Sequence, residues 1–293
     1  MRSEQEIMYL ITETARRDDR VRAVYQNGSR VNINAPKDIF QDYDIVYVVN
    51  EIASFLQESN WIDVFGERLI MQKPDELDVL RGIVSSQYDS YGYLMLFKDG
   101  NRIDLRLQTI EEMKRTYKKD SLTAPILDKD KILPNIPYPS DQSYHVSKPT
   151  AADYYSCTND FWWCLQNVAK GIWREELPYA KQMFDLIVRN DLDMMVAWWI
   201  GCKYNFQVSA GKMGKYFRNY LTEDYWTMYK STYSNCEKEV FWMSIFAACT
   251  LFRELALDVA TQLGFPYAAE EEAAMLHFLR SVQNLHTDAK KIF

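Results

Sequence analysis

The chain has 293 residues, of which 47% are hydrophobic; this is typical of packed globular protein, and the length is sufficient for about two domains. Lysine and arginine number 34 against 41 aspartates and glutamates, which gives a net charge of −7. This balance argues against nucleic acid as a partner, because a phosphate backbone normally requires a basic surface. An acidic protein is instead suited to a cationic small molecule.

The first element with a chemical signature is a short strand followed by a tight turn. The apolar run at 21–25 predicts the strand, and Asn27-Gly28 predicts a turn in which the glycine takes a positive φ. A phosphate can approach such a backbone closely. We expect the Gly28 amide and the Ser29 hydroxyl to hold phosphate oxygens.

A second strand is predicted at 42–49, where apolar residues follow an Asp-x-Asp pair. Because side chains alternate between the two faces of a strand, Asp42 and Asp44 point the same way, with their backbones roughly 7 Å apart. Two such carboxylates repel each other unless a cation lies between them. Mg²⁺ prefers oxygen ligands and leaves other positions open for water and phosphate, so the pair is suited to holding a metal-bound triphosphate.

A hairpin is predicted next, because Asp99-Gly100 separates apolar runs at 91–97 and 102–107. Alternation in its second strand directs three side chains to the core (Ile103, Leu105 and Leu107) and three to the opposite face (Arg102, Asp104 and Arg106). In a lone hairpin these would form a solvated polar face. Beside Asp42 and Asp44, however, Asp104 becomes the candidate third acid of a catalytic site.

The predicted secondary structure then changes from a mixture of strands and helices in the first half of the chain to helices alone in the second half. Residues 122–149 include five prolines, a composition typical of an extended connector. We place the boundary segment itself at 136–150, between a catalytic domain at 1–135 and a helical domain at 151–293. Helices are predicted at 151–173, 178–204, 209–221, 235–263 and 266–285, with Gly264-Phe265-Pro266 as a stop and restart.

Two features of the helical half bear on ligands. The segment Gly211–Tyr216 lacks the glycine spacing of a Walker loop and the hydroxyl residue after its lysine, but Lys212 and Lys215 have the charge needed to neutralise a triphosphate. The alternative is an ordinary solvated basic turn.

Aromatic residues in this half have two readings. Trp162 and Trp163 are expected in the core, since aromatic stripes on helices usually pack there. Trp173 lies instead at a predicted helix end beside Glu175 and Glu176, where stacking and charge-assisted hydrogen bonds can hold a guanidinium-bearing sugar.

The remaining composition indicates a cytoplasmic, soluble protein. Five cysteines, an odd number without a C-x-x-C spacing, read as buried free thiols in a reducing compartment, and the three histidines form no zinc pattern with them. We find no signal segment and no run of about 18 apolar residues that would span a bilayer.

Together these motifs resemble the nucleotidyltransferase superfamily that shares the DNA polymerase β catalytic fold. Within it the chain is similar to the aminoglycoside 6-adenylyltransferases, which inactivate streptomycin. The resemblance covers nearly the whole chain: an opening Met-Arg-Ser-Glu helix, Asn27-Gly28-Ser29-Arg30 with Asp42-Tyr43-Asp44-Ile45-Val46, the Asp104 hairpin, Pro134-Asn135 and Gly211-Lys212-x-Gly214-Lys215-Tyr216. The three acids alone are specific for the superfamily, whereas the choice of aminoglycoside as acceptor rests on the family match.

The resemblance implies an α+β fold, in which a nucleotidyltransferase domain with a mixed sheet flanked by helices precedes a C-terminal α-helical bundle. It implies Mg²⁺-dependent transfer of AMP from ATP to the 6-hydroxyl of streptomycin, with release of pyrophosphate. Metal ligands would be Asp42, Asp44 and Asp104, and Asp104 has a second possible role as general base. The nucleotide would be bound by Gly28, Ser29, Arg30, Lys212 and Lys215, and the aminoglycoside by Trp173, Glu175 and Glu176.

The expected partners are therefore an aminoglycoside and a nucleotide, with no nucleic acid and no membrane, and the protein is expected to be a monomer or weak homodimer. The alternative function is a non-catalytic, nucleotide-binding regulatory or antitoxin-like module. Such modules usually lose one of the acids or lack a long second domain, whereas this chain keeps all three acids and a sizeable helical half.

Overall fold

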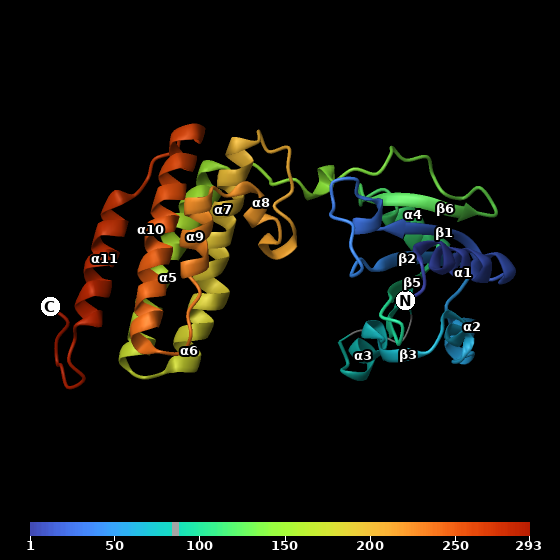
Figure 1. Ribbon diagram of the computed structural model, residues 1–293, viewed down its shortest axis with the longest axis horizontal. Helices are drawn as coiled ribbons and strands as arrows, with labels where there is room; N and C mark the ends of the chain where they lie inside the picture. Colours follow the sequence, from blue (N-terminus) through green and yellow to red (C-terminus); the bar gives the residue numbers. More distant parts are fainter. Residues whose placement is uncertain (84–87) are drawn as a thin grey trace. The chain divides into compact units, whose positions relative to one another are not determined.

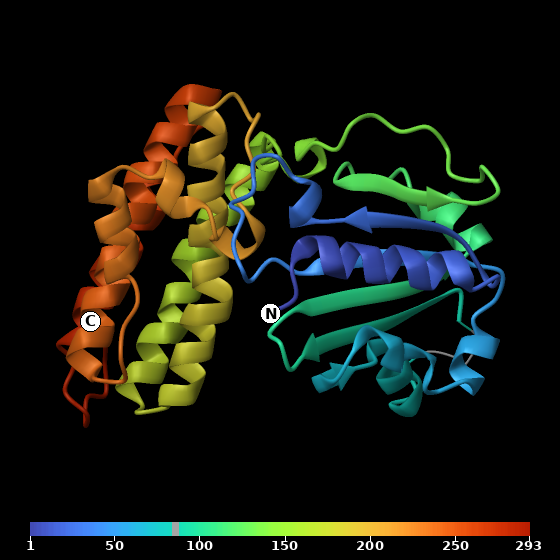
Figure 2. The ribbon, with the colours of Figure 1, turned by 45° about the vertical axis from the view of Figure 1, so that its right-hand side comes forward.

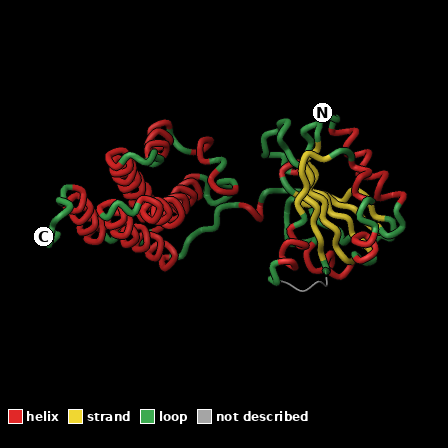
Figure 3. The backbone as a smooth tube through the Cα atoms, turned by 90° about the horizontal axis from the view of Figure 1, so that it is seen from below, coloured by secondary structure: helices red, strands yellow, loops and turns green. Residues whose placement is uncertain are grey.

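The structure is a computed structural model that describes residues 1–83 and 88–293. The chain forms two compact units, Met1–Ser143 and Tyr144–Phe293. The strands lie in the first unit, and helices make up the second (Figures 1 and 3). The α+β class expected from the sequence is confirmed. The division falls within 136–150, the stretch predicted as the connector.

A six-stranded sheet organises the first unit, in the order β3-β4-β5-β2-β1-β6. In chain order the strands are β1 (Val21–Asn27), β2 (Tyr43–Val49), β3 (Arg68–Gln72), β4 (Ser90–Phe97), β5 (Arg102–Thr109) and β6 (Thr123–Asp128). Within the described ranges, β2 and β5 pair in parallel and the other pairs are antiparallel. The sheet is therefore mixed, and the predicted strands and hairpin are confirmed.

The two faces of the sheet are covered differently. Helix α1 (Glu4–Arg17) runs across one face (Figure 2) and adds Ile7 and Ile11 to the buried cluster that also contains Tyr43 and Ile45. On the other face, α4 (Ile110–Thr116) covers the end where β2 and β5 finish, through contacts that include Met113. The opposite end of this second face, where β2 and β5 begin, carries the acids.

Short helices complete the first unit: α2 (Ala53–Gln57), α3 (Pro74–Leu80) and the 3₁₀ turns η1 (Ser29–Val31), η2 (Trp61–Phe65) and η3 (Gln142–Tyr144), the last of which reaches into the second unit.

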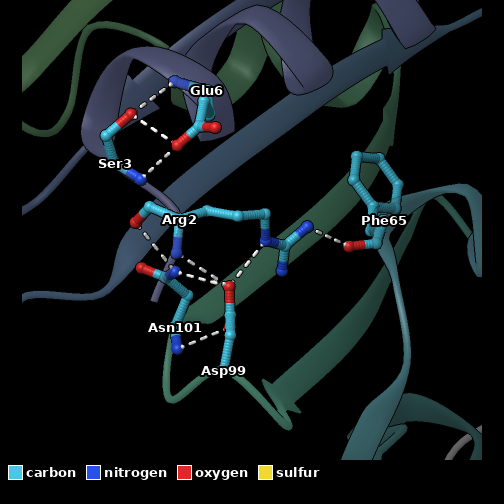
Figure 4. Close-up of polar contacts among 6 residues, drawn as sticks. All are labelled: Arg2, Ser3, Glu6, Phe65, Asp99 and Asn101. Carbon is cyan, nitrogen blue, oxygen red and sulfur yellow. Dashed lines mark hydrogen bonds and ion pairs between the residues drawn. The ribbon is translucent and has the colours of Figure 1, made fainter.

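The chain's first residues fasten the β4–β5 hairpin (Figure 4). The backbone N–H and the Nε of Arg2 donate to Asp99 Oδ2 at 3.1 and 2.7 Å, and its Nη1 donates to the Phe65 carbonyl at 2.6 Å. Asn101 Nδ2 donates to the Arg2 carbonyl, and Ser3 and Glu6 cap α1 reciprocally. The hairpin that carries Asp104 is thus held at its turn by the start of α1.

The second unit is built from long helices around one apolar core. They are α5 (Ala151–Trp173), α6 (Leu177–Gln182), the π-helical segment η4 (Met183–Val188), α7 (Arg189–Lys203), η5 (Lys212–Gly214), α8 (Phe217–Tyr220), α9 (Glu223–Ser231), α10 (Lys238–Leu263) and α11 (Ala269–Gln283). Four of the five predicted helical segments are confirmed, since α6, η4 and α7 continue into one another. Gly264 ends α10 in the left-handed conformation, as a C-terminal glycine commonly does.

Two predictions were wrong in part. The helix predicted at 209–221 is absent as one element, because Gly211, Met213 and Gly214 all have positive φ and break it into η5 and α8. The proline-rich stretch at 122–149 is not all connector, since β6 lies within it. Its Pro125 is tolerated because β6 is an edge strand, where a missing N–H costs no ladder bond on the open side.

Some burial predictions also failed. Trp162 is buried as expected, but the Trp163 side chain is 63% exposed. Cys157 and Cys249 are buried thiols, whereas Cys236 is exposed.

Among the helices in residues 1–83 and 88–293, α10 alone is long and apolar enough to cross a membrane by length and composition. Within its most apolar window, 56% is buried in the protein, as in a core helix.

One acid in the helical unit is buried without compensation. Asp191 in α7 is 7% exposed, and its Oδ2 has no hydrogen-bond partner in the described part of the chain. Burial, aided by the nearby charge of Asp160, raises the pKa of Asp191 to about 7. Asp191 therefore favours its protonated form in the folded state.

The substitution Asp191→Asn should stabilise the protein in a pH-dependent manner. An unfolded aspartate has a pKa of about 3.9, so from about pH 4 to pH 7 the folded wild type binds more protons than the unfolded chain and loses stability as the pH rises. The variant does not titrate there, so its advantage should grow across this window by about 1–3 kcal/mol and then level off. Urea unfolding followed by tryptophan fluorescence at several pH values measures it; every tryptophan except Trp61 lies in the helical unit. A difference that stays constant with pH would contradict the assignment.

Candidate active site

The parallel register of β2 and β5 brings two of the predicted acids together. Asp44 is the direct partner of Asp104 in this register, so their side chains share a face of the sheet. Asp42 precedes β2 by one residue. Asp44 and Asp104 line an open pocket of about 460 Å³, whose wall also includes Asn27 and Asp120.

The electrostatics of these acids indicate a shortage of positive charge. Burial is the largest cause that raises the pKa of Asp44 to about 6, and the charges of Asp104 and Asp42 raise it further. Burial also raises the pKa of Asp42, against a lowering influence of Arg102. Carboxylates kept close at this cost are suited to a cation.

One arginine faces the cluster. Arg102 Nε and Nη2 donate to the two carboxylate oxygens of Asp104 at 2.8 and 2.6 Å, and its Nη1 lies 3.3 Å from Asp42 Oδ2. In residues 1–83 and 88–293 no three acid, histidine or cysteine side chains are already gathered as a metal site. Asp44 and Asp104 line the pocket, and Asp42 lies beside them outside its lining, with the Arg102 guanidinium between Asp42 and Asp104.

The donor set fits a hard divalent cation. It consists of carboxylate oxygens: Asp44 and Asp104 face a pocket open to further ligands, as Mg²⁺ prefers, and Asp42 is the neighbouring third acid. The raised pKa of Asp44 gives the same indication, because a bound cation would remove the repulsion that causes part of it.

The glycine of the turn lies directly against this cluster. Gly28 has a φ of +80°, and a Cβ built on it would lie 2.2 Å from Asp44 Oδ2. The Gly28 N–H donates to the Leu122 carbonyl at 3.1 Å, so this amide is engaged by the protein. Gly28 contributes a close approach of backbone to carboxylate, and the Ser29 and Arg30 amides at the start of η1 are the remaining candidates for phosphate.

Asp120 is a residue of the site that the sequence analysis missed. Its Oδ1 accepts a hydrogen bond from the Leu122 N–H at 2.8 Å, and its Oδ2 accepts one from Asn27 Nδ2 at 3.3 Å. It ties the turn after β1 to the start of β6. The only sequence signal was its position two residues before the mostly apolar stretch at 122–127.

Arg30 positions the loop that leads into β2. Its Nη2 and Nε donate to the carbonyls of Gln41 and Asp42 at 2.8 and 3.1 Å, and its guanidinium stacks over Tyr43, 3.6 Å from the ring centre. A fourth contact joins it to Glu4 at 3.2 Å. The guanidinium is thus occupied by the protein and sets where Asp42 lies.

A family model described as streptomycin adenylyltransferase matches residues 1–282. The chain belongs to this family. It is 37% identical to an aminoglycoside 6-adenylyltransferase of Campylobacter jejuni over 96% of both chains. It is 36% identical to one of Bacillus subtilis over 93% of this chain and 95% of the other. A crystal structure of an aminoglycoside 6-adenyltransferase from Bacillus subtilis aligns with 97% of this chain and 100% of that one, at 31% identity and a TM-score of 0.48.

Membership of the streptomycin adenylyltransferase family confirms the resemblance inferred from the motifs. It also confirms the enzyme class, an aminoglycoside nucleotidyltransferase.

The other predicted residues of this family member lie in the helical unit, in two separate places. Lys212 and Lys215 are exposed in and beside η5, near the end of α7. Trp173, Glu175 and Glu176 lie in the turn from α5 to α6, where Trp173 Nε1 donates to the His286 carbonyl and Glu175 has a φ of +61°, uncommon for a residue with a side chain.

The two groups lie toward opposite ends of the helical unit. The end of α7 packs beside the segment before α5, since the Val146 side chain lies against Gly201, whereas Trp173 closes α5. At a rise of about 1.5 Å per residue, the 23 residues of α5 span roughly 34 Å. These groups therefore do not line one common pocket of that unit.

Gly28→Ala should damage the site more than the fold. At the backbone angles of Gly28, φ +80° and ψ −153°, alanine costs about 1–3 kcal/mol, and its Cβ would displace the Asp44 carboxylate, which should lower adenylyl transfer by about 100-fold. Product formation measures the first effect and urea unfolding the second. Gly264→Ala is the matched control, because Gly264 has a φ of +71° with nothing within 4 Å of the added Cβ. Equal activity losses in both variants would contradict the contact with Asp44.

Proposed function

We propose that the protein transfers AMP from ATP to a hydroxyl of an aminoglycoside, the 6-hydroxyl of streptomycin, releases pyrophosphate, and so confers resistance to the antibiotic. The observation that carries the proposal is the pairing of Asp44 with Asp104, with the Gly28 backbone pressed against Asp44. The near full-length similarity to enzymes named for 6-adenylyl transfer to aminoglycosides supports the acceptor.

The acids and the turn would divide the work. Asp42 and Asp44 would hold Mg²⁺, which when bound neutralises charge on the triphosphate. The Ser29 hydroxyl and the backbone at the start of η1 would orient the phosphates. Because Gly28 lacks a Cβ, the phosphates and the Asp44 carboxylate can lie close together without a clash.

The acceptor hydroxyl would attack the α-phosphorus in line with the departing pyrophosphate. A new oxygen–phosphorus bond forms as the bond between the α- and β-phosphates breaks, and the hydroxyl proton must leave. Asp104 has two possible roles: general base for that proton, or ligand of a second metal ion. Its place beside Asp44 is compatible with both.

The helical unit would provide positive charge for the nucleotide. Lys212 and Lys215 are exposed and make no ion pair in the described ranges, which leaves their ammonium groups available for the triphosphate and the leaving pyrophosphate. Trp173, Glu175 and Glu176, expected from the sequence to hold the cationic sugar, lie toward the other end of α5, so they would not hold the acceptor while these lysines hold the nucleotide. We place the protein in the cytoplasm, as a monomer or weak homodimer.

The function is tested by incubating the purified protein with Mg²⁺, ATP and streptomycin and weighing the products by mass spectrometry. We expect streptomycin carrying one added adenylate, with pyrophosphate as co-product. A panel of other aminoglycosides run beside it defines the acceptor range. Nucleotide binding without any modified acceptor would overturn the proposal in favour of a non-catalytic, nucleotide-binding module.

The substitutions Asp42→Asn and Asp44→Asn should each lower turnover by about 1,000-fold or more, since both remove charge where the metal-bound triphosphate must be stabilised. Neither acid contributes to the core, so the unfolding transition should be retained. Asp38→Asn is the control, because this exposed acid accepts a hydrogen bond from Phe40 N–H that an asparagine can also accept. Substantial turnover in both Asp42→Asn and Asp44→Asn would refute their metal-binding role.

The substitutions Lys212→Ala and Lys215→Ala should each raise the KM for ATP roughly three- to tenfold, the range expected on losing one charge-assisted contact to phosphate. Both lysines are solvent-exposed, so stability should not change. Lys230→Ala, an exposed lysine in α9, is the control. Steady-state kinetics with ATP varied at saturating streptomycin makes the measurement, and a KM equal to that of the Lys230 variant would assign these lysines to a solvated turn.

A further inference from the structure

Arg102 makes contacts that compete with the proposed use of the acids it touches. Its guanidinium engages both oxygens of Asp104 and lies within 3.3 Å of one oxygen of Asp42. These are carboxylates that the proposed function assigns to a divalent cation. The Arg102 side chain is 44% exposed, more than Asp104 at 18% or Asp42 at 33%, so it has room to leave.

The geometry explains why the acids are neighbours without forming a ready-made metal site. A bidentate guanidinium fixes the plane and direction of the carboxylate it binds. It points Asp104 toward Arg102, and a divalent cation at the same oxygens would face a positive charge a few ångströms away. Metal and guanidinium therefore exclude each other.

We infer that Arg102 is the resident counter-ion of the acidic site, which a divalent cation must displace from Asp104 and Asp42. The inference rests on the proposed metal-binding role of these acids and adds a residue that opposes it. A free metal ion gains the carboxylates but leaves the guanidinium unpaired. A metal–nucleotide complex brings phosphate oxygens that can coordinate the metal and also accept hydrogen bonds from the displaced guanidinium. Arg102 therefore couples metal binding to the arrival of nucleotide.

A neighbouring arginine provides a close control. Arg106 lies two residues further along β5, on the same face, and lines the same pocket. Its Nη1 donates to the Ser90 hydroxyl at 2.9 Å, and among the described contacts it makes no ion pair with an acid. Replacing either arginine removes one positive charge from the same strand face, but only Arg102 contacts Asp42 and Asp104.

The test is titration of Mn²⁺ alone, without nucleotide, into the full-length wild type, Arg102→Gln and Arg106→Gln, followed by calorimetry. Arg102→Gln should bind Mn²⁺ roughly three- to tenfold more tightly, because one bidentate ion pair no longer has to break. Arg106→Gln should stay within about twofold of the wild type, as expected for a more distant charge screened by solvent. Thermal unfolding gives a second readout: saturating Mn²⁺ should raise the midpoint of Arg102→Gln by more than that of the wild type.

Arg102→Lys keeps the positive charge but cannot make the bidentate contact of a guanidinium. We expect its affinity for Mn²⁺ to lie between those of the wild type and Arg102→Gln. It is the informative variant if Arg102→Gln fails to fold by circular dichroism. Asp44→Asn should abolish binding in every background.

The outcomes distinguish failure of the role inferred for Arg102 from failure of the proposed metal site. If the wild type binds Mn²⁺ at a site lost in Asp44→Asn, and Arg102→Gln and Arg102→Lys bind no more tightly, only the inference is overturned. An equal gain in Mn²⁺ affinity in Arg106→Gln also overturns it, because the gain would then follow from removing any positive charge near the site. If wild type and arginine variants alike bind no Mn²⁺, the proposed metal site falls together with the inference.

Discussion

The active face of this protein depends on the parallel pairing of β2 with β5. That register sets Asp44 opposite Asp104 and, on the reverse face, directs Tyr43 and Ile45 into the core beneath α1. A slip of one residue would turn every side chain of β2 to the other face. The core therefore fixes the register, and the register fixes the distance between the two acids.

The same strand also organises the turn that the phosphates are proposed to approach. β1 pairs with the other edge of β2, so that Asn27 is the partner of Asp44 and Gly28 follows immediately beside its carboxylate. Asp120 and Arg30 then fix the two ends of the loop, one through Asn27 and the other through the carbonyls at 41 and 42. Close approach of backbone to acid is thus maintained by residues that need not contact a ligand.

Much of the sheet and of the acidic site could be predicted because it follows from patterns of neighbouring residues in the sequence. The alternation at 42–49 and 102–107 located both strands and the faces of their acids, and Gly264-Phe265-Pro266 located the end of α10. The failures have long-range or conformational causes. Asp120 gains its role from Asn27, 93 residues earlier, and β6 exists because an open edge of β1 accepts a strand containing Pro125. At 209–221, the helix is interrupted by a positive φ at Met213, which the helix propensity of methionine does not predict.

The order of strands also bears on how the chain is made. β1 and β2 leave the ribosome early, but their outer neighbours are β6 and β5, which end at residues 128 and 109. Until those segments emerge, a nascent β1–β2 pair presents open hydrogen-bonding edges on both sides, which are exposed to pairing with other chains. Protection of the first unit by chaperones during synthesis should therefore matter most before residue 128 is released.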